Sequence, residues 1–101
     1  MNFEDFRAEI ETKLNSIVEF ELIEFHYLHY CFGNGILAYR IKGRIHKFIF
    51  DGRDNILTWL ISKDHQKYSD VKLTEYFRFS GLNINEEELL KGIKNSAQHA
   101  I

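Results

Sequence analysis

Hydrophobic residues near the N-terminus recur every three or four positions, which is the spacing of one helical face. Asn2 stands where a helix cap is expected, and Glu4 and Asp5 suit the positive end of the helix dipole. We predict an amphipathic helix that ends near Asn15 and Ser16 and packs one face on a sheet. Its apolar residues are Phe3, Phe6, Ile10, Leu14 and Ile17.

The next segment, residues 18–32, changes to the alternating pattern that is typical of a strand. Apolar residues alternate with glutamates up to Leu22, and the alternation then shifts by one residue at Ile23. Such a shift indicates a bulge or a bend, because side chains on a strand point to alternate faces. We predict one long, bent strand, followed by a hairpin turn at Gly33-Asn34-Gly35.

Three further strands are predicted at residues 36–42, 45–51 and 56–62, each separated from the next by a short turn. Short turns join antiparallel neighbours, so these strands form a meander. Ile36 and Ile49 place apolar side chains on the second face as well. This face is therefore expected to be covered in part, by another element or by another copy of the chain.

The segment from Ser62 to Asp70 is polar and is predicted to be a loop, whereas residues 71–80 are ambiguous. Asp70 and Gly81 have the character of a helix cap and a helix stop, which favours a short helix. The aromatic residues between positions 76 and 79 favour a strand instead. We predict the helix and keep a fifth strand as the alternative.

A final helix is predicted after Asn85, because Glu88 completes a capping box and Ile84 is placed to contact Leu89. The order of these elements predicts a single α+β domain over residues 1–101. Its sheet is an antiparallel meander of four strands, or five if residues 71–80 form a strand. The N-terminal and C-terminal helices are expected to pack on one face of this sheet.

The composition is that of a globular chain. Its 101 residues are 45% hydrophobic and 28% charged, which excludes a disordered or low-complexity chain. The single cysteine, Cys31, excludes a disulfide framework. The pattern of a secretory signal is missing, as is any run of about 18 apolar residues that would span a membrane. We therefore expect a cytoplasmic protein that does not enter a membrane.

The motifs that could carry chemistry are weak. Gly33-Asn34-Gly35 begins a G-x-G-x-x-A pattern, but a strand pattern follows where a dinucleotide site needs a helix. His29 and Cys31 supply too few ligands for structural zinc. On a strand they would also lie too far apart for a nucleophile and its base. We expect no cofactor and no metal site, and this favours a protein that is not an enzyme.

Basic residues gather in the middle of the chain although its net charge is −2. A basic sheet face would attract anions or nucleic acid. However, Tyr39 points to the opposite side of its strand from its neighbour, so aromatic and basic groups do not interleave. The candidate anion-binding residues are Arg40, Lys42, Arg44, Lys47 and Arg53.

Nine Phe, five Tyr and one Trp are a large aromatic supply for a chain of this length. These residues can fill the core, cover the sheet in a homodimer, or line a cavity in which Tyr39, His46 and Trp59 converge. We predict a small non-enzymatic binding protein that forms a homodimer through its sheet and has a protein partner. The alternatives are an anion or nucleic-acid binder and a small-molecule-binding or enzymatic domain with an aromatic cavity.

Overall fold

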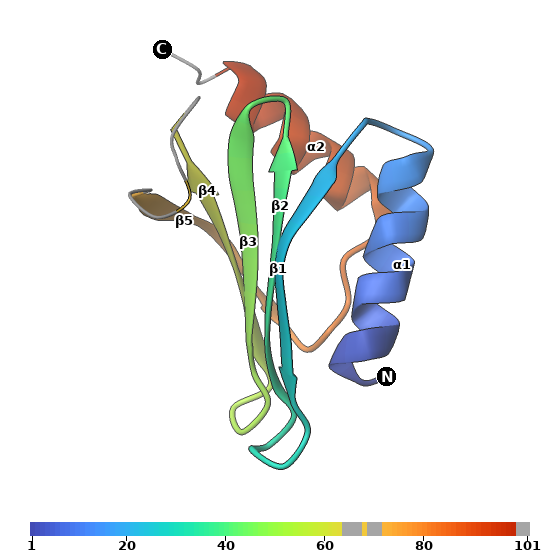
Figure 1. Cartoon of the computed structure of the whole chain (residues 1–101), viewed down its shortest axis with the longest axis vertical. Helices are drawn as coiled ribbons and strands as arrows, with labels where there is room; N and C mark the ends of the chain where they lie inside the picture. Colours follow the sequence, from blue (N-terminus) through green and yellow to red (C-terminus); the bar gives the residue numbers. More distant parts are fainter. Residues whose placement is uncertain (64–67, 69–71, 99–101) are drawn as a thin grey trace.

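The computed structural model describes residues 1–63, 68 and 72–98, the last four of them by their backbone alone. Within these ranges the elements are α1 (Phe3–Asn15), β1 (Glu21–Leu28), β2 (Asn34–Ile41), β3 (Arg44–Asp51), β4 (Ile56–Ser62), β5 (Leu73–Ser80) and α2 (Glu86–Gln98). The strands form one antiparallel sheet in the order of the sequence, and both helices lie on the same face of it (Figure 1). The predicted α+β fold is confirmed.

The N-terminal helix follows its sequence pattern. The Asn2 side chain accepts a hydrogen bond of 2.8 Å from the Asp5 backbone N–H, and the Asp5 carboxylate accepts one of 3.2 Å from the Asn2 N–H. This capping box satisfies two donors that a helix start leaves unpaired. The helix ends at Asn15 with Ser16 as its C-cap, as predicted, and four residues of its apolar face are buried: Phe3, Phe6, Ile10 and Leu14. Ile17, which we also predicted on this face, follows the helix and is half-buried.

The strand that we predicted over residues 18–32 is shorter than expected. β1 covers Glu21–Leu28, and the chain then turns through residues 29–33. The turn that we predicted at Gly33-Asn34-Gly35 is therefore placed too late, because Asn34 and Gly35 already belong to β2 and pair with β1. The predicted shift in alternation is confirmed, because the pairing of β1 with β2 changes register between Leu22 and Glu24. The opposite end of β2 leads into β3 through Lys42 (φ 51°) and Gly43 (φ 80°), as in the tight turns that join twisted strands.

The helix that we favoured for residues 71–80 is wrong, and the alternative is correct. β5 pairs with β4 so that Phe79 lies opposite Leu57 and Phe77 opposite Trp59. A register shift at this point makes room for Tyr76, whose ring centroid lies 5.0 Å from that of Trp59. This pairing covers an edge that β4 would otherwise expose. Most of the predicted loop before β5 lies outside the described residues.

The core lies between the sheet and its two helices. α1 contributes its buried face, and α2 contributes Leu89 and Ile93. α2 approaches β4 so closely that a Cβ atom on Gly92 would lie 2.2 Å from the Trp59 ring. Glycine is therefore required there by contact, and the sheet face beneath the helices is closed around Phe48 and Trp59.

Candidate protein-binding surface

The structure separates the five predicted anion-binding residues. Arg40 and Lys42 line a hollow of about 540 Å³ at the start of β1, and Glu19 and Glu21 line the same hollow. Arg53 lies in the turn between β3 and β4, at the opposite end of the sheet. Arg40 and Lys42 therefore stand beside acidic side chains, and Arg53 is separated from both by the length of the sheet.

Lys47 takes part in a cluster on the uncovered face of the sheet. Its Nζ atom lies 3.5 Å from Glu24 Oε1 and 5.4 Å from the centre of the Tyr68 ring. The Tyr68 hydroxyl donates a hydrogen bond to Glu24, and this bond, together with the charge of Lys47, lowers the pKa of the Glu24 carboxyl. The remaining member of the set, Arg44, is buried and donates through Nη1 to the Ser62 carbonyl at 3.3 Å.

The three predicted cavity residues have no exposed surface. Trp59 Nε1 donates to His46 Nδ1 at 3.2 Å, and the Tyr39 hydroxyl donates to Glu11 Oε2 at 2.9 Å. Burial, with a smaller effect of the nearby Arg44 charge, lowers the pKa of His46 to about 4. Burial and the Glu11 carboxylate raise the pKa of Tyr39. The polar groups of all three thus lie within the packed core, and a ligand cavity beside them stays a prediction.

His29 and Cys31 lie in the turn after β1 rather than on a strand, which corrects the geometry that we assumed for them. Among the residues that the structure describes, no group of three or more His, Cys, Asp or Glu side chains is placed to hold a metal ion.

Two turns meet at the lower end of the sheet in Figure 1, and the protein's own contacts hold them together. Asn34 Oδ1 accepts a hydrogen bond of 2.7 Å from the Gly52 N–H. Gly52 also passes so close to the Phe32 carbonyl that a Cβ atom would lie 1.7 Å from its oxygen. Asp51 Oδ1 accepts a further bond of 3.0 Å from the Arg53 N–H, which fixes the second turn.

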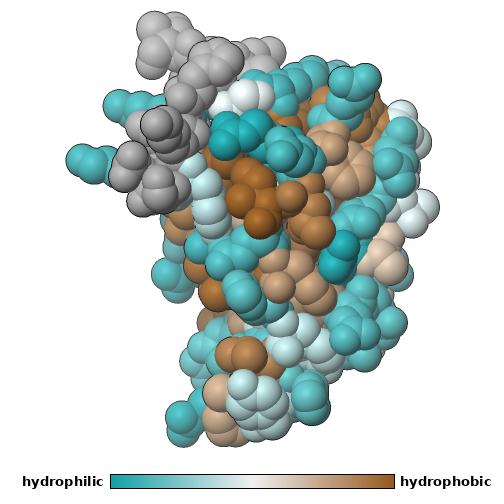
Figure 2. Space-filling view, viewed as in Figure 1, coloured by the Kyte–Doolittle hydropathy of each residue, from teal (hydrophilic) through white to brown (hydrophobic). Residues whose placement is uncertain are grey.

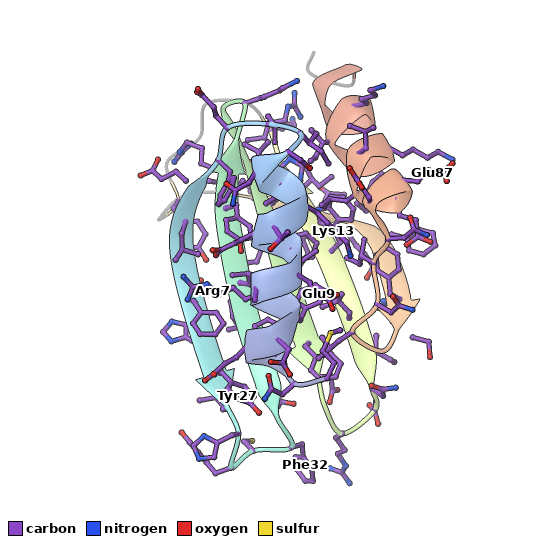
Figure 3. The ribbon with its side chains drawn as sticks, turned by 90° about the vertical axis from the view of Figure 1, so that its right-hand side faces the viewer. Arg7, Glu9, Lys13, Tyr27, Phe32 and Glu87 are labelled. Atoms are coloured by element: carbon purple, nitrogen blue, oxygen red, sulfur yellow. The ribbon has the colours of Figure 1, made fainter. Side chains whose placement is uncertain are left out.

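This pair of turns exposes aromatic side chains. Tyr30 is 79% exposed and Phe32 is 65% exposed, and the Arg53 guanidinium lies 5.7 Å from the centre of the Phe32 ring. We call Tyr30, Phe32 and Arg53 the aromatic tip. Figure 3 shows Phe32 at this end of the sheet, below α1. Sequence reasoning missed the tip because it assigned residues up to 32 to a strand, where aromatic side chains are expected to be buried.

Phe32 has a strained backbone as well as an exposed ring. Its φ angle is 57°, in the left-handed region that residues other than glycine, asparagine and aspartate rarely adopt. Core packing does not compensate for this conformation, since most of the side chain faces solvent. Lys42, followed by Gly43, has the same geometry in the β2–β3 turn, so the positive φ angle of Phe32 is a feature of the turn. The turn does not explain why a phenyl ring is exposed at this position.

An apolar hollow lies on the uncovered face of the sheet, next to the tip. It has a volume of about 330 Å³, and two of its walls, Leu28 and Ile49, are 38% and 37% exposed. Figure 2 shows hydrophobic residues among hydrophilic ones at this end of the molecule. We call this apolar hollow the outer hollow. The residues that line it are His26, Leu28, Asn34, Gly35, Ile36, Ile49, Phe50 and Asp51.

Comparisons with protein-family models, with curated proteins and with solved structures found no match for this chain. Within the described ranges, neither helix is long and apolar enough to cross a membrane.

Proposed function

We propose that this protein acts by binding rather than by catalysis, and that it works as a homodimer formed through the uncovered face and lower end of its sheet. The observation that carries this proposal is the gathering of large exposed hydrophobic residues around the two lower turns. Large hydrophobic residues that are exposed near one another can mark interaction sites on soluble proteins. The residues are Leu28, Tyr30, Phe32 and Ile49.

Titratable groups with shifted pKa values, among the residues that the structure describes, support a binding role. His46 is hydrogen-bonded to Trp59 inside the core, and Glu24 is engaged with Tyr68 and Lys47. A general acid or base must come within hydrogen-bond reach of a substrate. His46 and Glu24 instead contact side chains of their own protein, and burial and these contacts cause their pKa shifts.

The margins of the uncovered face favour a second copy as the partner. His26 and Glu24 stand on β1, and Glu75 and Arg78 stand on β5, with the apolar Ile49 between the two edges. Each margin thus carries both a carboxylate and a basic group. A face of this kind can complement itself when a second copy is turned by half a revolution.

Sedimentation equilibrium of the purified protein tests this proposal. The expected result is a concentration-dependent mass that approaches twice 12.0 kDa. A mass of one chain at every concentration up to about 1 mM, which corresponds to a binding free energy weaker than about −4 kcal/mol, would contradict it.

A further inference from the structure

We infer that the two copies hold each other by reciprocal insertion, in which the Phe32 ring of each copy enters the outer hollow of the other. This inference rests on the proposed homodimer and identifies the contact that forms it.

Phe32 has the properties of an inserting residue. The hydrogen bond between Asn34 and Gly52 and the close contact of Gly52 with the Phe32 carbonyl hold its backbone in place before any partner binds. Binding a side chain on a backbone that is already fixed loses less conformational entropy than ordering a free loop. The turn that gives Phe32 its positive φ angle also leaves most of the ring exposed to solvent.

The outer hollow has the size and lining that a phenyl ring needs. Its volume is about 330 Å³, and an apolar cavity of roughly 150 Å³ is enough to hold benzene. Leu28, Ile36 and Ile49 line it with aliphatic carbon atoms. A ring in this hollow would cover the lower part of the sheet face that lies opposite the helices.

The position of the hollow beside the tip favours a dimer with two-fold rotational symmetry. Asn34 lines the hollow and also binds the turn that carries Arg53, so the inserting ring and the receiving site are neighbours. A half-turn rotation brings each ring onto the other copy's hollow, and the assembly closes at two chains. Charge complementarity supports this arrangement, since Arg53 accompanies the ring and Asp51 lines the hollow.

The same charges count against an anionic membrane as the occupant of the tip. The carboxylates of Asp51 and Asp54 stand in the turn that carries Arg53, and they would be repelled by acidic lipid headgroups. Binding of the wild-type protein to phosphatidylserine vesicles, without self-association, would overturn the inference.

Phe32→Asn is the most direct test, because asparagine tolerates a positive φ angle and so removes the ring without straining the fold. We expect the dimer dissociation constant to rise about a hundred-fold, since both inserted rings are lost. The apparent melting temperature of the monomer should not fall. Phe77→Ser removes a phenylalanine that is 53% exposed on β5, at the opposite edge of the sheet from β1, and should leave the dissociation constant unchanged.

Ile49→Lys blocks the hollow while leaving Phe32 in place, and we expect this variant to be monomeric as well. A mixture of Phe32→Asn and Ile49→Lys chains should form a heterodimer, because one intact ring can enter one intact hollow. The heterodimer should be at least about ten-fold tighter than either variant with itself.

The outcomes separate the inference from the proposed function. If the wild type dimerises but both variants dimerise equally well, or if the mixture does not associate, the inference is overturned while the homodimer stands. If the wild-type chain is a monomer at all concentrations, both are overturned.

Discussion

The two faces of the sheet differ in composition and in burial: the covered face is rich in aromatic residues, whereas the uncovered face mixes aliphatic and charged side chains. On the covered face, Phe48 and Trp59 have no exposed surface because both helices pack over them. On the uncovered face, Ile49 remains more than one-third exposed. Helix packing thus accounts for the aromatic residues on one face, whereas the exposed groups at the lower end require a different explanation.

The uncovered face is itself divided into two parts. Towards the upper end, Ala38 and Ile45 are fully buried, and Tyr68 reaches Glu24 and Lys47. Towards the lower end, the outer hollow and the aromatic tip stay open.

Removing Trp59 should show how strongly the covered face depends on packing. We expect Trp59→Ala to lower the free energy of unfolding by about 3–5 kcal/mol, because it leaves a cavity beneath α2 and an unpaired His46 ring nitrogen. Ile49→Ala on the other face should cost less than about 1 kcal/mol. Urea denaturation of both variants measures the difference, and equal losses would contradict the contrast between the faces.

Acid should destabilise the covered face through His46. Its pKa is about 4 in the folded protein, below the ordinary value of 6.5, so the unfolded chain binds the proton more tightly. The free energy of unfolding should fall as the pH drops from 6.5 towards 4, by about 3 kcal/mol in total from this group.

His46→Gln supplies the control for this pH dependence. The variant should lose that part of the dependence and retain the part due to carboxyl groups. Parallel curves of unfolding free energy against pH for the two proteins would show that His46 is not the cause.

A methyl group at Gly92 should disturb the contact between α2 and β4. Although alanine is the better helix former, the added Cβ would lie 2.2 Å from the Trp59 ring, and the helix must shift to accommodate it. We expect Gly92→Ala to cost about 1–3 kcal/mol in thermal or urea unfolding. Lys94→Ala, at an exposed position of the same helix, should be nearly neutral; a loss as large as that of the glycine variant would argue against the contact.

The smallest effect is expected at the aromatic tip, and it has the opposite sign. Phe32→Asn should raise the unfolding free energy of the monomer by up to about 1 kcal/mol, because the backbone strain is relieved and little packing is lost. Calorimetry under conditions that keep the protein monomeric measures this change. A clear destabilisation would mean that the Phe32 ring serves the fold rather than an interaction.

Local patterns predicted most of the fold. The first helix was found because its cap and its apolar face lie within a few residues of each other, and the bulge in β1 was found from one shift in alternation. Residues 71–80 were assigned wrongly because Asp70 and Gly81 resemble helix ends, whereas the pairing of β5 with β4 depends on residues distant in sequence.

The candidate surface was much harder to predict. Whether Phe32 continues a strand or stands in a turn depends on the register between β1 and β2 and on the contact with Gly52, and neither is visible in the local sequence. The separation of Arg53 from Arg40 likewise follows from the length of β3, which lies between them.

Analytical ultracentrifugation of the wild-type and Phe32→Asn proteins, side by side over the same concentrations, decides whether the lower end of the uncovered face binds a second copy. We expect a reversible wild-type dimer of twice 12.0 kDa and a variant that stays at one chain mass. A wild-type protein that remains monomeric throughout would contradict the proposed homodimer.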